Sequence, residues 1–259
     1  MEDLSTEEKQ IYDRQIRIWG MEAQAKLRQA SVTLHNFDAF NSELSKNIVL
    51  SGINLAVKDT STVQRSDLVC NFYLTEEDLG RNKSQVAIQR VKAINPLVQV
   101  SSEAASGVVC VSGSFSEVLL VAEECRANNT PCYCVVSAGK RILVLADLIK
   151  RTLQGTTEEY LSIKETISKL PKFLETYRRR NSGVLKAFLE ALYYRDSGNL
   201  TQTAQSILED LGSSFMPSIS VVAGLVAEDI VNFITEQGNP FHALFFDGVT
   251  SDAFRVKLY

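Results

Sequence analysis

The stretch SVTLHNFDAFNSELSKNIVLSGINLAVKD, residues 31–59, decides the fold of this chain. An alternating apolar run at residues 32–34 predicts a strand. A helix is predicted next from apolar residues spaced four apart, which are Phe40, Leu44 and Ile48. A second strand is predicted over residues 53–57. A strand, a helix and a strand in this order normally open a doubly wound, largely parallel sheet, so we expect an α/β fold.

The turn after the first predicted strand lacks the features of a phosphate-binding turn. Nucleotide-binding folds of this kind place glycines there, so that backbone amides and a helix N-terminus reach the phosphate. Here the turn reads HNFDAFN over residues 35–41, and residues 32–51 contain no glycine. Asp38 adds a negative charge where a phosphate would bring its own. The simpler interpretation is that Asp38, Asn41 or Ser42 caps the helix.

Composition and charge exclude several classes of protein. The chain has 259 residues, of which 45% are hydrophobic and 22% are charged, and its net charge of -4 gives no overall attraction to nucleic acid or an anionic membrane. The one concentrated basic run, residues 178–180, is interpreted as a solvated helix end, with a nuclear-import or anion-binding role as the alternative. Five cysteines without a C-x-x-C pair, and only two histidines, indicate neither a disulfide framework nor a metal site.

No targeting or membrane-spanning segment is predicted. Residues 1–10 are polar and acidic, unlike a signal peptide. The most apolar helix, residues 218–235, contains Glu228 and Asp229 and is too short and too charged to span a bilayer. We therefore expect an intracellular protein without a membrane partner. Because this helix is apolar almost all round, we expect it to be buried on two sides, within this chain or against a partner.

The rest of the chain suggests three parts. Strands and helices alternate through residues 1–146, which predicts one Rossmann-like half. Residues 147–212 have helical periodicity with many charges and are interpreted as a short helical insertion. Residues 213–259 return to the sheet through the apolar helix and two C-terminal strands, which we expect to form an antiparallel pair. Further strands are predicted at residues 98–100, 108–111, 133–136 and 142–145, and further helices before Asn95 and at 117–128.

The N-terminal helix, predicted over residues 5–19, carries two arginines. The sequence Ser5-Thr6-Glu7-Glu8 can cap it. On helical spacing one face is formed by Tyr12, Ile16 and Trp19, while Arg14 and Arg17 lie together on another. Two adjacent guanidinium groups suit an anion. The structural alternative is that both pair with nearby acids, such as Glu7, Glu8, Asp13 or Glu22.

The run YDRQIRIWG, residues 12–20, resembles the N-terminal motif of the non-catalytic subunits of SUMO-activating enzymes, which belong to the ThiF/MoeB-like adenylating superfamily. The resemblance covers nearly the whole chain except residues 147–212. It continues through SKNIVLSG at 45–52, LGRNK at 79–83, INP at 94–96, VAGLVAEDI at 222–230 and FFDG at 245–248.

This resemblance implies an inactive nucleotide site in this chain. Asp59 matches the ribose-binding aspartate and Lys83 the lysine of catalytic members, and these two are the expected remnants. Asp67 replaces an asparagine, Cys70 replaces an arginine, and Ser114 stands near the place of the last aspartate. Without the glycines and the arginine, most of the charge stabilisation that phosphoryl chemistry needs is missing.

The resemblance also implies a division of work between two subunits. The catalytic partner would hold ATP, Mg²⁺ and the thioester cysteine, and Arg14, with Arg17, would reach the partner-bound ATP in trans. The expected function is to support ATP-dependent adenylation and thioester transfer of the modifier by that partner. SUMO and the conjugating enzyme would be contacted through the complex. We expect a nuclear protein with a cytoplasmic pool.

Three alternatives differ in what the chain itself would do. A homodimeric ThiF/MoeB-like adenylating enzyme would need the lost glycines and the arginine replaced by Cys70. The regulatory subunit of the NEDD8-activating enzyme has a similar N-terminal motif, but that family usually carries a much longer inserted domain. A free-standing dinucleotide-binding protein is excluded by the missing glycines.

Overall fold

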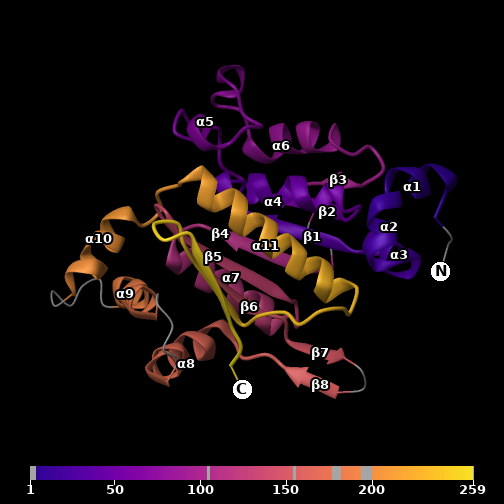
Figure 1. The fold of residues 1–259 in the computed structure, drawn as a ribbon. Helices are drawn as coiled ribbons and strands as arrows, with labels where there is room; N and C mark the ends of the chain where they lie inside the picture. The colour runs from indigo at the N-terminus through magenta and orange to yellow at the C-terminus, as the bar shows by residue number, and fades with distance from the viewer. Residues whose placement is uncertain (1–3, 104–105, 154–155, 177–181, 194–199, 259) are drawn as a thin grey trace. The chain divides into compact units, whose positions relative to one another are not determined.

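The computed structural model describes residues 4–103, 106–153, 156–176, 182–193 and 200–258. The chain divides into two compact units, which are described separately (Figure 1). Unit 1 comprises Met1–Cys110, Thr152–Thr156 and Ala223–Pro240, and unit 2 comprises Val111–Arg151, Thr157–Val222 and Phe241–Tyr259. The basic run at residues 178–180 lies outside the described residues.

Unit 1 contains the βαβ unit that the sequence predicts. Strand β1 pairs in parallel with β2, from Ser31 opposite Asn54 to His35 opposite Lys58, and β2 pairs in parallel with β3. Helices α4 and α6 pack against these strands and against each other. The elements are α1 (Thr6–Ile11), α2 (Asp13–Trp19), α3 (Met21–Gln29), β1 (Ser31–His35), α4 (Ala39–Leu50), β2 (Asn54–Lys58), α5 (Asp67–Cys70), the 3-10 helix η1 (Glu76–Asp78), α6 (Lys83–Lys92) and β3 (Val100–Ser101).

The apolar face predicted for the first helix is the buried face of α4. Phe40, Leu44 and Ile48 are each at most 1% exposed, so the spacing of four in the sequence identifies the side that packs on the strands. The predicted N-terminal helix is instead divided at Tyr12 into α1 and α2. Its predicted cap is confirmed, because Ser5 and Glu8 form a reciprocal capping box.

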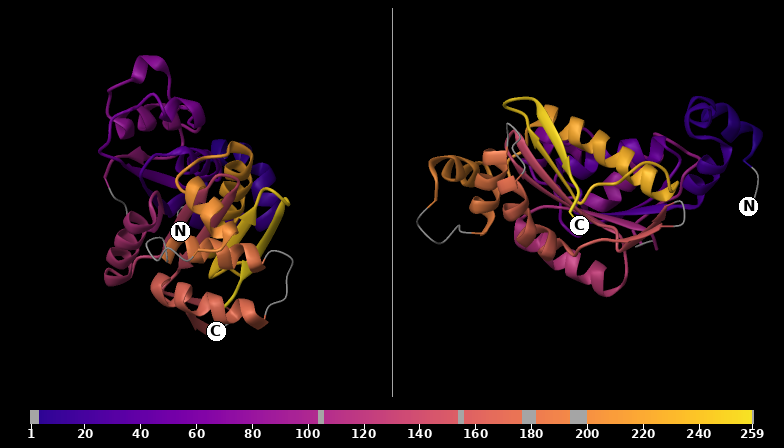
Figure 2. Two further views of the ribbon diagram at one scale, coloured as in Figure 1. Left: turned by 90° about the vertical axis from the view of Figure 1, so that its left-hand side faces the viewer. Right: turned by 60° about the horizontal axis from the view of Figure 1, so that its bottom comes forward.

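Unit 2 is built on antiparallel strands. The chain enters it along β4 (Val108–Ser112), and the order of the following strands is β5-β6-β9-β10. The last two of these strands are drawn in yellow in Figure 2. Helix α7 packs on β5, and α8 packs on β6. The elements are β5 (Cys132–Ala138), β6 (Arg141–Asp147), β9 (Ala243–Asp247), β10 (Asp252–Val256), α7 (Phe115–Ala127), α8 (Ile163–Thr176), α9 (Ser182–Tyr193) and α10 (Gln202–Asp210).

The antiparallel part is larger than the C-terminal strand pair that we predicted. Strand β6 pairs antiparallel with both β5 and β9, and β9 pairs antiparallel with β10. The extra pairing follows from a two-residue turn at Gly139 and Lys140, where Gly139 has the positive φ of 56° that tight hairpins require. The predicted α/β class, with a C-terminal antiparallel pair, is confirmed.

Residues 147–212 differ in part from the prediction of helices alone. Two short strands, β7 (Lys150–Leu153) and β8 (Thr156–Glu159), precede α8, α9 and α10. The division into three parts at 146 and 212 stays a prediction.

Helix α11 (Met216–Ile234) is the apolar helix that the sequence predicts, with Pro217 near its start. The expectation that it is too short and too charged to span a bilayer is wrong by these two criteria, because among the described residues α11 is the one helix long and apolar enough to cross a membrane. Half of that stretch is buried in the fold, which is typical of a core helix. Asp229 within it is 1% exposed.

His242 holds the end of β10 in unit 2. Its side chain is fully buried and stacks on Tyr160 with ring centroids 4.5 Å apart. The Nδ1 atom accepts a hydrogen bond from the backbone N–H of Leu258 at 3.3 Å, which requires a ring without a proton on that nitrogen. Burial lowers the pKa of His242, and the charged groups that act on it are Glu158, Lys257 and Lys169.

We expect the stability of the fold to fall as the pH drops below the pKa of an unfolded histidine, about 6.5. The unfolded chain takes up the proton more readily than the folded chain, so unfolding is favoured by acid in this window. Urea unfolding between about pH 7.5 and 5.5 measures this dependence. The variant His242→Asn keeps an acceptor near Leu258 and does not titrate, so its stability should decline less. An equal decline in both proteins would show that His242 is not responsible.

Candidate functional site

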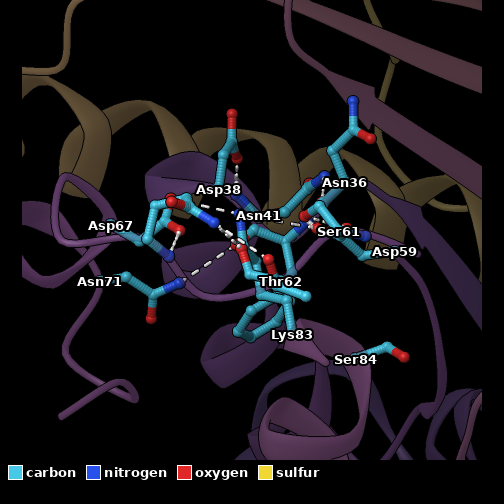
Figure 3. A network of polar contacts seen from close by, with 12 residues as sticks. Asn36, Asp38, Asn41, Asp59, Ser61, Thr62, Asp67, Asn71, Lys83 and Ser84 are labelled. Carbon is cyan, nitrogen blue, oxygen red and sulfur yellow. Dashed lines mark hydrogen bonds and ion pairs between the residues drawn. The ribbon is translucent and has the colours of Figure 1, made fainter. Parts of the chain in front are cut away.

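The turn after β1 is closed by its own side chains (Figure 3). Asp38 is the N-cap of α4 and accepts a hydrogen bond from the backbone of Asn41 at 3.0 Å, which confirms the capping interpretation. The Asn41 amide donates to the carbonyl oxygens of His35 at 2.8 Å and Asn36 at 2.7 Å. Asn36 has a φ of 65°, the left-handed conformation that a glycine would adopt most easily. Asparagine tolerates this conformation, so the turn keeps its shape without glycine.

Two backbone amides of this turn, those of Asn36 and Phe37, have acceptors within the protein. The N–H of Asn36 donates to the carbonyl of Lys58 at 3.1 Å. The N–H of Phe37 donates to Asp59 Oδ2 at 2.7 Å. Amides at these positions would face the phosphate in a nucleotide-binding turn. Here a phosphate would have to displace a carboxylate before it could be bound.

Asp59, one of the two expected remnants, is likewise used inside the protein. While its Oδ2 accepts from Phe37, its Oδ1 accepts from both the backbone N–H and the hydroxyl of Ser61, at 2.8 and 2.6 Å. The residue is only 8% exposed. Both oxygens therefore hold the turn and the following loop together, and a ribose hydroxyl would compete with these internal hydrogen bonds.

Lys83, the other remnant, forms ion pairs with two carboxylates. Its Nζ lies 3.2 Å from Asp67 Oδ1 and 4.0 Å from Asp59 Oδ2, and the residue is 8% exposed. Asp67, the residue expected to replace an asparagine of catalytic members, supplies the negative charge that pairs with the lysine. Two carboxylates therefore lie within 4.0 Å of one ammonium group, and this net negative charge opposes the binding of a triphosphate.

The remaining positions of the expected site do not contribute phosphate ligands. Cys70 ends α5, and the amide of its neighbour Asn71 donates to the carbonyl of Phe37 at 3.2 Å. Ser114 lies in unit 2 at the N-cap of α7, where it forms a capping box with Glu117. That helix N-terminus therefore already has a carboxylate beside it.

We expect the isolated chain to bind ATP weakly or not at all. The reason is that the turn amides, Asp59 and Lys83 are all engaged within the protein. Titration calorimetry with ATP and Mg²⁺ is the measurement. The variant Asp67→Asn frees Lys83 from its closest partner but restores no amide cradle, so it should not bind either. Micromolar binding to the unaltered chain would contradict this interpretation.

The two arginines of α2 differ in their contacts, a difference that the sequence did not reveal. Arg17 pairs with Asp13 one turn earlier, with Nη2 2.9 Å from Oδ2, as the structural alternative proposes. Both side chains are mostly exposed, so this pair contributes little stability. Arg14 is exposed and has no hydrogen bond or ion pair with the residues that the structure describes. Arg14 is therefore the guanidinium that is available to an external anion.

Helix α2, which carries the two arginines, also lines a groove of mixed apolar and polar side chains, Glu228 among them, which the sequence analysis missed. It lies within unit 1, has a volume of about 480 Å³, and is lined by residues of α2, α4 and α11 that include Gln15, Ile18, Trp19, Leu50, Gly224 and Val231. Ile18 is 78% exposed and Leu50 47% exposed. A Cβ atom at Gly224 would meet no atom within 4 Å, so this part of α11 is open. The sequence signal was Ile18, an apolar residue outside the predicted apolar face.

The chain is similar to proteins of known family. Residues 12–107 match the model of the ThiF family. The chain is 27% identical to the DNA damage tolerance protein RHC31 of Saccharomyces cerevisiae, over 97% of each chain. It is 26% identical to SUMO-activating enzyme subunit 1 of Dictyostelium discoideum, over 95% of this chain and 92% of that protein. The resemblance identified from the sequence is thereby confirmed.

Solved structures confirm the fold. The structure of PaaA covers 99% of this chain and 75% of its own, with a TM-score of 0.66 and 16% identity. Escherichia coli MccB with ATP covers 95% of this chain and 71% of its own, with a TM-score of 0.63 and 16% identity. At such identities the likeness concerns the fold alone. The alignment with RHC31 spans 337 positions, more than the 259 residues here, so that relative contains stretches that this chain lacks.

Proposed function

We propose that this chain is the non-catalytic subunit of a heterodimeric SUMO-activating enzyme. In this role it supports the ATP-dependent adenylation of the modifier, and its transfer to a thioester, by a catalytic partner. The observation that carries the proposal is the similarity, over nearly the full length of both chains, to proteins named SUMO-activating enzyme subunit 1. The engaged amides of the turn after β1, and the pairing of Lys83 at the start of α6 with Asp67, support it, because a subunit with such a site needs a partner to hold ATP and Mg²⁺.

The groove of unit 1 is the proposed contact surface for the catalytic subunit. Exposed apolar side chains such as Ile18 and Leu50 lose solvent contact when a partner covers them, at roughly 25 cal/mol per Å² of apolar surface. The open α11 backbone at Gly224 allows a partner helix to approach closely. Because α2 lines this groove and also carries Arg14, a partner bound there would lie close to the free guanidinium.

Arg14 is the residue proposed to act on the reaction. Adenylation develops negative charge on the α-phosphate and on the departing pyrophosphate, and a permanently charged guanidinium can bind two oxygens at once. Arg17 would stabilise the phosphates less than Arg14 does, because Asp13 already offsets its charge. ATP and Mg²⁺ would be held by the partner, and SUMO and the conjugating enzyme would be contacted through the complex.

The alternatives receive less support. A homodimeric adenylating enzyme needs a nucleotide site in each chain, and here the amides, Asp59 and Lys83 of that site are engaged in internal contacts. A regulatory subunit of the NEDD8-activating enzyme is less well supported, because the relative from Dictyostelium discoideum is named SUMO-activating enzyme subunit 1.

The proposal is tested by purifying the tagged chain from its own cells and identifying stoichiometric partners. One catalytic subunit of a SUMO-activating enzyme per chain is the expected result. A catalytic subunit for another modifier, or recovery of the chain only as a homodimer, would replace the proposal by one of the alternatives. Microscopy of the tagged chain would test the proposed location, nuclear with a cytoplasmic pool.

A further inference from the structure

The last carbonyl oxygens of α4 accept hydrogen bonds from three side-chain amides. Gln15 Nε2 donates to Leu50 at 2.8 Å, Gln24 Nε2 donates to Ser51 at 3.0 Å, and Asn95 Nδ2 donates to Val49 at 2.7 Å. The last carbonyls of a helix have no partner within the helix, so the bonds to Leu50 and Ser51 satisfy groups that would otherwise need water. The carbonyl of Val49 also accepts from the backbone N–H of Gly52 at 3.1 Å. The three residues, which we call the amide cluster, come from α2, α3 and the loop after α6.

The amide cluster is joined to both ends of α2. At the start of the helix, Asn95 Nδ2 also donates to the hydroxyl of Tyr12 at 2.8 Å, and Tyr12 is 3% exposed. At its end, Trp19 Nε1 donates to Gln24 Oε1 at 3.1 Å. Together with Gln15 in the middle, these contacts fix one face of the helix, and Arg14 lies outside that face.

Gly52 makes this arrangement possible. It follows α4 with a φ of 84°, which ends the helix and turns the chain away. A Cβ atom at this position would lie 2.9 Å from Gln24 Nε2 and 3.0 Å from the Tyr12 hydroxyl. A larger residue would be strained at this φ and would displace the Gln24 and Tyr12 side chains from their present hydrogen bonds.

We propose that the amide cluster is a positioning device, which fixes the direction in which α2 presents Arg14 to the partner-bound ATP. This inference rests on the proposed function. It assigns Gln15, Gln24 and Asn95 as positioning residues that act through Arg14 and do not touch the nucleotide.

The length of α2 explains why such a device is needed. A helix of seven residues is too short to be stable in water by itself, so its orientation is set by the contacts at its sides. Stabilisation by a guanidinium depends on bidentate geometry, and a misplacement of about 1 Å can cost roughly a hundredfold in rate. Hydrogen bonds from short amide side chains to a fixed helix end define a position more narrowly than apolar packing does.

The test uses Gln15→Met, which keeps the size of the side chain and removes the donor to Leu50. In a heterodimer reconstituted with the catalytic subunit, this variant should slow ATP–pyrophosphate exchange roughly tenfold through kcat. In the Arg14→Ala background the same change should cause no further loss, because it acts through Arg14. Gln10→Met, at an exposed position of α1, is the matched control and should be without effect. In the isolated chain, Gln15→Met should lower the fluorescence anisotropy of Trp19, the single tryptophan.

The outcomes distinguish the inference from the proposed function. An equal loss caused by Gln15→Met in both backgrounds, or full activity together with unchanged Trp19 anisotropy, would overturn the positioning role alone. Full activity of Arg14→Ala would overturn the trans role and the inference with it, even if Trp19 still responds to Gln15→Met. If Gln15→Met fails to fold, Asn95→Asp is the second variant, because it keeps the shape of the side chain and loses the donor to Val49; the same outcomes apply.

Discussion

Replacing Arg14 by alanine should slow ATP–pyrophosphate exchange by the reconstituted heterodimer by roughly a hundredfold or more, while assembly stays intact. Arg14 is exposed and unpaired among the described residues, so its removal breaks no contact within the chain. The loss would therefore come from the transition state, where a guanidinium offsets the charge that develops on the phosphates. Exchange measures the adenylation step directly, and size-exclusion chromatography measures assembly.

Two further variants sharpen this prediction. Arg14→Lys keeps the charge but not the bidentate geometry, so it should recover only part of the rate. Arg17→Ala removes an arginine whose charge is already compensated by Asp13, so it should have a much smaller effect than Arg14→Ala. Full exchange activity in Arg14→Ala would refute the trans role, and a larger effect at Arg17 would transfer that role to Arg17.

Replacing Leu50 by glutamate should weaken association with the catalytic subunit by roughly a hundredfold or more, because a carboxylate would be buried there without a partner. Leu50 is 47% exposed in the groove of unit 1, so the change is expected to leave the folded chain intact. Titration of the labelled catalytic subunit with each variant gives the two dissociation constants.

The matched control for this experiment is Leu120→Glu. Leu120 is 69% exposed on α7 and does not line the groove. This control should bind the partner with unchanged affinity. An unchanged dissociation constant for Leu50→Glu would show that the groove is not the contact surface, and a loss for Leu120→Glu alone would place that surface on α7.

Local patterns in the sequence predicted the local structure well. The spacing of Phe40, Leu44 and Ile48 identified the buried face of α4, because a helix needs one apolar side to pack on a sheet. The absence of glycine from the turn, together with Asp38, indicated a capped helix start in place of a phosphate site. These features depend on residues a few positions apart, whose geometry is fixed by the helix itself.

Contacts between distant residues could not be predicted in the same way. The pairing of Lys83 with Asp67, and the bonds from Gln15 and Asn95 to the end of α4, join residues that only the folded chain brings together. Sequence spacing left both arginines of α2 equivalent, since either could reach an acid nearby. Arg17 pairs with Asp13 because the two residues lie one helical turn apart on α2. This helix begins only after the break at Tyr12, which the sequence did not predict.

Formation of a thioester between SUMO and the catalytic subunit tests the central claim most directly. With ATP, Mg²⁺ and labelled SUMO, we expect no thioester from this chain alone and little from the catalytic subunit alone. Both together should give a thioester on the catalytic subunit, saturating at one chain per partner. A SUMO adenylate or thioester formed by this chain without the partner would contradict the claim, as would a catalytic subunit whose activity is unchanged when this chain is added.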